Sequence, residues 1–272
     1  MSARHYSIND LLQVMQRLRD PVTGCPWDLE QDFNSIVPST LEECYELAQA
    51  IEQEDYEHVA EELGDVLFQV IFYAQLGKEQ NLFSFQTVVH TLVEKLIRRH
   101  PHVFAQGKIA GVATIRSSVH EVRESWELIK QRERDARNQS GVLADVPHAL
   151  PALSRAQKVQ KRAAQVNFDW TDTSSVLDKL QEELDELRSA ISAQQSVAIR
   201  DELGDVLFTC VNLARHLGHD AEKSLRQATD KFEQRFRNME SSVVARGQEL
   251  SNLSETQYDQ LWVQAKADLD GR

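Results

Sequence analysis

Glu42-Glu43-Cys44-Tyr45-Glu46, followed by Glu61-Glu62-Leu63-Gly64-Asp65-Val66-Leu67-Phe68, is a pattern that occurs twice in this chain of 272 residues. The second copy reads Glu182-Glu183-Leu184-Asp185-Glu186 and then Asp201-Glu202-Leu203-Gly204-Asp205-Val206-Leu207-Phe208, at a constant offset of 140. From Glu42 to Phe68, 13 of 27 positions match, including acids that a buried core does not explain. A repeat of about half the chain predicts two related domains.

The composition predicts an all-α protein made of two tandem repeated helical-bundle domains. Gly (10 residues) and Pro (6) are scarce, and few stretches alternate with the period of a strand. The helical pattern is broken over residues 137–151, which include Gly141 and two prolines. We therefore expect an N-terminal domain over 1–136, a linker over 137–151 and a C-terminal domain over 152–272.

Capping signals indicate where the helices begin. Ser7 with Asp10 has the spacing of a capping box, and so has Ser39 with Glu42. The second pair predicts that the paired acids lie in the first turns of their helix. The expected helices cover about 7–20, 39–54, 56–76, 84–99 and from 118 in the first half, and about 153–164, 176–193, 197–217, 221–243 and 255–268 in the second.

Two acidic patches are expected to face each other in each half. Glu42, Glu43 and Glu46 share one helix surface, because residues three or four apart are neighbours. Glu62 and Asp65 border an apolar stripe on the next helix, which is predicted to be buried. The stripe consists of Val59, Leu63, Val66, Leu67, Val70, Ile71 and Ala74. Antiparallel packing of the helices would offer these oxygens to a hard divalent cation, which would relieve their mutual repulsion.

The acidic motif has other interpretations besides a metal site. Exposed carboxylates are common on helices, but two patches beside one apolar stripe, present twice, favour metal. A di-iron bundle normally uses Glu-x-x-His on two helices, and the Asp55 to His58 spacing has no equivalent in the second copy. A non-catalytic helical scaffold, or a nucleotide- or metal-binding protein that has kept the motif, stays open as an alternative function.

The net charge and the cysteine content restrict the classes of partner and the cellular location. A formal net charge of −13 argues against a nucleic-acid duplex, whose binding depends on Lys and Arg. A phosphorylated small molecule is compatible with this charge if Mg²⁺ lies between the phosphates and the acids. Three cysteines without metal-ligand spacing, and no apolar run of 18 residues, favour a cytoplasmic protein without a membrane span.

Basic and aromatic residues also recur, at an offset of 136. The matched pairs are Lys95 with Lys231, Arg99 with Arg235, Trp126 with Trp262, and Lys130 with Lys266. Cations four residues apart destabilise an isolated helix slightly, and a bound phosphate would compensate. The indole rings could stack on a base, although burial in a core is the commoner role of Trp.

Loop tryptophans and helical glycines complete the repeated pattern. Trp27 and Trp170 precede the acidic helices, where they could line a base pocket or pin the first helix of each half. Gly64 and Gly204 lie inside helical patterns, where Gly is unfavourable relative to Ala. They predict a close approach of a helix or a ligand.

Taken together, these motifs resemble the MazG family of nucleoside triphosphate pyrophosphohydrolases, within the all-α pyrophosphatase superfamily. The resemblance covers nearly the whole chain and rests on both acidic motifs and on the segments 25–28, 98–104, 168–170 and 212–218. It implies Mg²⁺-dependent hydrolysis of NTPs or dNTPs to the monophosphate and pyrophosphate, with broad base specificity, by a tandem-domain homodimer. Two or more Mg²⁺ ions per site are expected, and Mn²⁺ could substitute.

The resemblance also implies roles for individual residues. The C-terminal domain, which is associated with activity in tandem members, would bind metal through Glu183, Glu186, Glu202 and Asp205, and substrate through Lys179, Lys231, Arg235, Trp262 and Lys266. The N-terminal equivalents are Glu43, Glu46, Glu62 and Asp65 for metal, and Lys95, Arg99, Trp126 and Lys130 for substrate. The water-orienting catalytic carboxylate would be Glu182 or Asp201, the latter standing where the first copy has Glu61.

Overall fold

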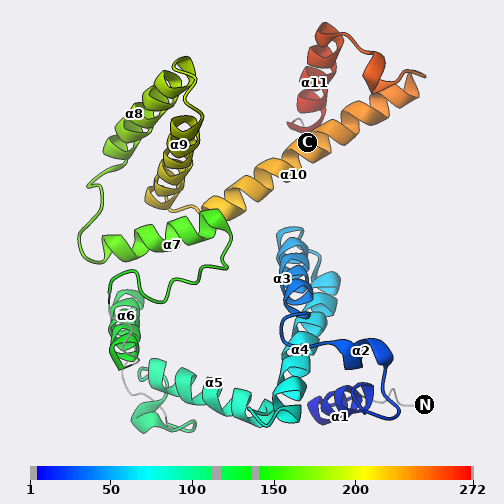
Figure 1. The fold of residues 1–272 in the computed structure, drawn as a ribbon, viewed down its shortest axis with the longest axis vertical. Coiled ribbons are helices and arrows are strands. Elements are labelled where there is room, and N and C mark those ends of the chain that lie inside the picture. The colour runs from blue at the N-terminus through cyan, green and yellow to red at the C-terminus, as the bar shows by residue number, and fades with distance from the viewer. Residues whose placement is uncertain (1–4, 112–117, 137–140, 271–272) are drawn as a thin grey trace. The chain divides into compact units, whose positions relative to one another are not determined.

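The computed structural model describes residues 5–111, 118–136 and 141–270. Over these ranges the chain folds into α-helices and short 3-10 turns without any strand, which confirms the all-α prediction (Figure 1). Its contacts define two compact units, Met1–Lys130 (unit 1) and Gln131–Arg272 (unit 2). The boundary falls inside α6 (Val119–Ala136). Within the described ranges, every helix is too short or too polar to span a membrane.

Unit 1 is organised around a pair of adjacent helices, α3 and α4, that are joined by a short turn (Figure 1). The helices that precede α6 are α1 (Ile8–Leu18), α2 (Pro26–Glu30), α3 (Val37–Glu52), α4 (Tyr56–Glu79) and α5 (Phe85–Arg99). The core lies where α1 meets the C-terminal half of α4, and consists of Met15, Ile36, Ile71, Phe72 and Leu76. The short helix α2 was expected to be a loop.

Side-chain caps mark most helix starts in unit 1, but the predicted cap of α3 is wrong. Ser7 forms the expected capping box with Asp10. Ser39 does not cap α3, because that helix begins two residues earlier, at Val37, with Pro38 in its first turn. Proline fits the first turn of a helix, where its missing N–H is not needed. Glu42 therefore lies in the second turn of α3 and not in the first.

Unit 2 repeats the adjacent helix pair in α8 and α9 (Figure 1). Its helices are α7 (Ala152–Ala164), α8 (Thr173–Ser192), α9 (Ser196–His216), α10 (Ala221–Ala245) and α11 (Glu255–Asp270), all within a few residues of the predicted bounds. A second core joins α10 to α11 through Met239, Val243, Leu261 and Ala265. Of the expected linker over 137–151, residues 137–140 lie outside the described residues, and 141–151 contain no helix.

The apolar stripe on α4 is buried only toward the C-terminal end of the helix. Ile71 is fully buried, whereas Leu63 is 52% exposed and Leu67 is also exposed. The corresponding Leu203 and Leu207 of α9 are exposed as well. The prediction of a continuous buried face is therefore wrong within the single chain. The described core covers only the C-terminal half of α4, and a helix pair leaves one of its own faces open.

We expect Phe72→Ala to lower the free energy of unfolding of unit 1 by about 3–5 kcal/mol, because it leaves a cavity where a fully buried ring packs against Met15 and Ile71. Urea denaturation followed by circular dichroism measures the change. Val22→Ala, at a side chain that is 88% exposed, is the control and should stay within about 0.5 kcal/mol. Equal effects of the two substitutions would contradict the assigned core.

Candidate functional site

Three carboxylates of unit 2 meet between α8 and α9. Glu183 and Glu186 lie about one turn apart on α8, and Glu202 lies on the adjacent α9. Each offers an oxygen, and these oxygens lie within 4.8 Å of one another. Desolvation raises the pKa of Glu202, and the charges of Glu186, Glu183 and Asp205 raise it further. Asp205 is thus the fourth acid at the same site.

Unit 1 holds the equivalent cluster between α3 and α4. Glu43, Glu46 and Glu62 again offer oxygens within 4.8 Å of one another. Desolvation raises the pKa of Glu43, and the charge of Asp65 is the next largest cause. The structure therefore brings the predicted acids of each half together at one place. This is the arrangement expected if the acidic patches of two antiparallel helices face each other.

A divalent cation fits the chemistry of both clusters. Carboxylate oxygens are the ligands that Mg²⁺ and other hard cations prefer, and a cation would offset the repulsion that raises the pKa values. Glu62 is buried, and its Oε2 atom has no hydrogen-bond partner among the described residues. A buried carboxylate oxygen in this condition is costly unless a cation or another donor reaches it.

A basic side chain on the same helix pairs with the buried acid of each cluster. In unit 2, Lys179 Nζ lies 2.8 Å from Glu182 Oε1 and 2.9 Å from Glu183 Oε1. Its hydrogen bonds to Glu182 and then to Glu183 raise the pKa of Lys179. In unit 1, His58 Nε2 lies 2.8 Å from Glu62 Oε1. The sequence did not predict this role for His58, and Asp55 caps the helix instead of serving as a ligand.

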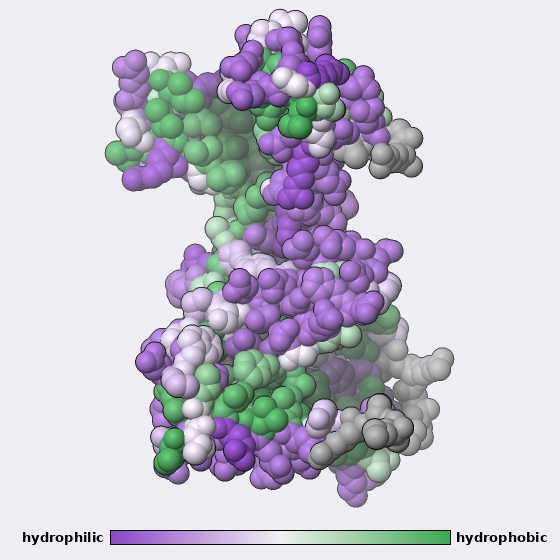
Figure 2. All heavy atoms as spheres, turned by 90° about the vertical axis from the view of Figure 1, so that its right-hand side faces the viewer, coloured by the Kyte–Doolittle hydropathy of each residue, from purple (hydrophilic) through white to green (hydrophobic). Residues whose placement is uncertain are grey.

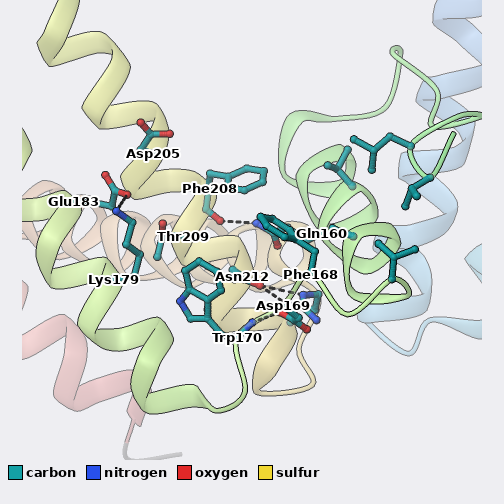
Figure 3. Close-up of a pocket in the computed structure, with 16 residues that line it drawn as sticks. Gln160, Phe168, Asp169, Trp170, Lys179, Glu183, Asp205, Phe208, Thr209 and Asn212 are labelled. Atoms are coloured by element: carbon teal, nitrogen blue, oxygen red, sulfur yellow. Dashed lines mark hydrogen bonds and ion pairs between the residues drawn. The ribbon is translucent and has the colours of Figure 1, made fainter.

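A cavity of about 470 Å³ opens beside the unit 2 cluster (Figure 3). Its polar and charged lining residues are Gln160, Asp169, Lys179, Glu183, Asp205, Thr209, Asn212 and Arg215, and its aromatic ones are Phe168, Trp170 and Phe208. The remaining wall is aliphatic and includes Val142 and Leu143 from the segment that was expected to be a linker. The cavity thus joins an acidic region to an aromatic and aliphatic one.

Asp169 fixes the loop that carries Phe168 and Trp170. Its Oδ1 atom accepts hydrogen bonds from Arg215, from His216 Nε2 at 3.0 Å and from the Trp170 backbone N–H at 2.9 Å. The bond from Arg215 is the largest cause that lowers the pKa of Asp169. Trp170 is thereby held on the cavity wall, and its role in lining a base pocket stays a prediction. Trp27, in contrast, lies on α2 and is more than half exposed.

Of the predicted substrate residues of unit 2, Lys179 lines this cavity, whereas Lys231, Arg235, Trp262 and Lys266 do not. Lys231 and Arg235 lie on α10, and the Lys266 ammonium lies 5.8 Å from the centre of the Trp262 ring on α11. Trp262 also packs against Phe232, which makes it part of the core between α10 and α11. Packing against a core, the commoner role considered for Trp, therefore applies to Trp262, although the ring is only partly buried.

The first half shows the same arrangement of its Trp. Trp126 of α6 lies with its ring centre 5.8 Å from the Arg99 guanidinium and 5.4 Å from the Lys130 ammonium. The His100 ring meets the indole edge to face at 4.8 Å. Lys95 lies one turn before Arg99 on α5. In each half, a Trp and neighbouring cations thus form a cluster on helices other than the acidic pair.

The candidate water-orienting carboxylates and the helical glycines face outward. The Glu182 side chain is 57% exposed and bound to Lys179, and the Asp201 side chain is 62% exposed with Arg200 Nε 3.7 Å away. A Cβ added to Gly64 or Gly204 would meet no described atom within 4 Å. The predicted close approach of a helix to these glycines is therefore wrong within the single chain.

The sequence did not identify several polar residues of the cavity. Gln160, Thr209, Asn212 and Arg215 come from α7 and α9, on positions that face the cavity. The signal available was weak, since a polar residue on an amphipathic helix normally faces solvent. Only the structure shows that Gln160 is buried.

Comparisons with known proteins agree on one family. A family model described as MazG nucleotide pyrophosphohydrolase domain matches residues 31–104 and 171–239, which contain both clusters. The nucleoside triphosphate pyrophosphohydrolase of Escherichia coli (strain K12) is 48% identical over 263 residues, which cover 95% of this chain and 97% of that protein. The nucleoside triphosphate pyrophosphohydrolase/pyrophosphatase MazG of Thermotoga maritima is 41% identical over 94% of each chain. The uncharacterized protein YabN of Bacillus subtilis is 40% identical over 96% of this chain and 52% of its own length.

We expect Asp169→Asn to destabilise unit 2 at pH 7 by about 1–3 kcal/mol, because it weakens charged hydrogen bonds to Arg215 and His216. The pKa of Asp169 is lowered by folding, so its contribution is present above the unfolded pKa and is lost as pH falls through the folded value. The difference in thermal stability between wild type and variant should therefore shrink below about pH 4. Asp185→Asn, at an exposed ion pair on α8, is the control; a pH-independent difference for Asp169→Asn would contradict the assigned contacts.

Proposed function

Because this chain belongs to the MazG family of nucleotide pyrophosphohydrolases, we propose that it hydrolyses nucleoside triphosphates to monophosphates and pyrophosphate at the acidic cluster of unit 2. The observation that carries the choice of this cluster is the cavity beside Glu183 and Asp205 (Figure 3). A nucleotide with its base in the aromatic part of the cavity would hold its phosphates at the acids. The cavities described at α1 in unit 1 include none of Glu43, Glu46 and Glu62.

Magnesium is the cation that we propose for the unit 2 cluster, with Glu183, Glu186, Glu202 and Asp205 as its ligands. Two or more ions per site, with Mn²⁺ as a substitute, would suit four carboxylates and a triphosphate. When bound, such ions neutralise phosphate charge and lower the pKa of a bound water. Glu43, Glu46, Glu62 and Asp65 are the corresponding proposed ligands in unit 1.

Charged side chains around the cluster would position the phosphates and the attacking water. Lys179 pairs with Glu182 and Glu183. The Lys179 ammonium group would gain a second set of oxygen partners from a triphosphate that approaches the carboxylates. Glu182 is exposed beside the buried Glu183, so it could orient a water without itself ligating metal. Asp201, one residue before Glu202, is the second candidate for this role.

A homodimer is the assembly that the exposed apolar faces of the helix pairs favour. Leu203, Leu207 and Phe208 of α9 are exposed, and Gly204 on the same helix faces open space among the described residues. Figure 2 shows hydrophobic side chains gathered in surface patches on each unit. Contiguous apolar patches of this kind normally mark an interface, and a second helix pair would complete a four-helix bundle. A second copy of the chain supplies such a pair.

Dimerisation would also account for the substrate residues that lie away from the cavity. Lys231, Arg235, Trp262 and Lys266 stay on α10 and α11, so we propose that they reach the nucleotide from a second copy. Lys95, Arg99, Trp126 and Lys130 would act in the same way at unit 1. We further propose a cytoplasmic location, which the three free cysteines favour because thiols stay reduced there.

Glu202→Gln should reduce the rate of pyrophosphate release from dNTPs with Mg²⁺ at least about 100-fold, equivalent to about 3 kcal/mol of transition-state stabilisation. The substitution keeps the shape of the side chain and removes one metal-binding charge. Glu62→Gln, the matched change in unit 1, reports whether that cluster contributes. Glu233→Gln, at an exposed ion pair on α10, should leave the rate unchanged. Full activity of Glu202→Gln would refute the unit 2 assignment.

Leu207→Glu should convert the dimer to a monomer in light scattering, because it places a charge in the apolar face of α9. Val22→Glu, at a position of unit 1 that is 88% exposed and lies outside the helix pairs, is the control and should leave the mass unchanged. Circular dichroism checks that both variants stay helical. A monomeric wild type would contradict the dimer, and so would a Leu207→Glu variant that keeps the dimer mass.

A further inference from the structure

Gln160 is a buried amide with one of its two polar atoms left without a partner. It lies on α7, is 6% exposed and lines the cavity. Its Nε2 atom donates to the backbone oxygen of Phe208 at 2.8 Å, which fixes the orientation of the amide. Its Oε1 atom is buried and accepts no hydrogen bond from any described residue. Buried acceptors are normally paired, so this oxygen indicates a donor supplied from elsewhere.

Gln157 is a buried amide on the same helix, and both of its polar atoms have hydrogen-bond partners. It lies three residues earlier on α7 and is equally buried, at 5% exposed. Its Nε2 atom donates to the His219 oxygen, and its Oε1 atom accepts from the Ala221 N–H, both at 3.2 Å. Both ends of Gln157 thus join α7 to the start of α10. The Oε1 atom of Gln160, by contrast, lies on the side of α7 that lines the cavity and has no such partner among the described residues.

The region around Gln160 has the character of a pocket for a flat ring. Phe168 and Trp170 supply aromatic surface, and Val142 and Leu143 supply aliphatic surface. Asn212 Oδ1 is bound by the Arg215 guanidinium, at 3.1 Å from Nε, which leaves the Asn212 amide nitrogen as the group that can donate. A volume of about 470 Å³ lies in the range of small-molecule sites.

One position that lines the cavity of unit 2 is a core position in unit 1. At the offset of 140, Asn212 corresponds to Phe72, whose ring is fully buried against Met15 and Ile71. The repeated fold can therefore carry a buried apolar side chain at this position. Unit 2 instead has Asn212 there, on the wall of a cavity that also includes Gln160 and the acids Glu183 and Asp205 (Figure 3).

We propose that Gln160 Oε1 accepts a hydrogen bond from an N–H group on the edge of the nucleotide base. This inference rests on the proposed function, which places the phosphates at Glu183 and Asp205. All standard bases carry such an N–H, so the contact favours nucleotides in general and rejects those whose edge has lost it. It therefore gives a broad base specificity a physical basis. Because Oε1 is buried in this structure, we expect the ring of Phe168, a lining side chain that is 74% exposed, to shift as the base reaches the oxygen.

The first test compares nucleotides that differ in one N–H group, on the wild-type protein. The pairs are ATP with purine riboside triphosphate, which lacks the 6-amino group, and UTP with N3-methyl-UTP. We expect kcat/KM to fall about tenfold for the altered member of each pair, because the buried acceptor stays unpaired. Equal kcat/KM values within both pairs would overturn the proposal and indicate that the oxygen meets only water.

The second test asks whether the loss depends on Gln160. In Gln160→Leu the difference within each pair should disappear, whereas Gln157→Leu, matched in helix, burial and residue type, should keep it. A difference that persists unchanged in Gln160→Leu overturns the proposal. If Gln160→Leu does not fold, as judged by circular dichroism, the wild-type comparison still decides.

A failure of the proposed function gives a different result. No pyrophosphate release from any nucleotide by the wild type would count against the reaction. In that case calorimetric titration with AMP and purine riboside monophosphate tests the base contact by itself. Tighter binding of AMP by the wild type and by Gln157→Leu, but not by Gln160→Leu, supports the contact, and equal binding in all three proteins refutes it.

Discussion

Repulsion among carboxylates on two adjacent helices is the constraint on which the rest of this protein depends. Each helix pair brings three acid oxygens within 4.8 Å of one another, although like charges at that distance oppose folding. In each unit a basic side chain of the same helix pairs with a buried glutamate of the cluster. This side chain is Lys179 in unit 2 and His58 in unit 1. Because the two units use different basic residues at different positions, the acids are common to both units and the basic partner is not.

The sequence predicted the helices and the acidic clusters well because both depend on local spacing. Residues three and four apart on a helix are neighbours whatever surrounds them, so the meeting of Glu183, Glu186 and Glu202 required only that α8 and α9 pair. The start of α3 was misplaced because Ser39 fits a cap and Pro38 fits a first turn, and the proline prevailed. Several residues can each signal the start of a helix, and the sequence does not show which of these signals prevails.

The cavity could not be predicted in the same way, because distant segments form it. Its wall combines α7, α8, α9, the loop that holds Trp170, and a segment that lacks helical periodicity. The apolar stripe shows the same limitation, since periodicity identifies the apolar face of α4 but not what covers it. Leu63 and Ile71 belong to one stripe in the sequence, yet only Ile71 is buried in the core of its unit.

Val142 and Leu143 lie in a stretch that composition marks as a connector, yet both form part of the cavity wall. The segment that links the two repeats therefore also shapes the space beside the unit 2 acids. A shortened chain that begins at α7 would retain every carboxylate of the unit 2 cluster and would lose one side of the pocket. In the history of such a duplicated protein, changes in connector length or sequence would thus alter ligand selection without touching either repeat.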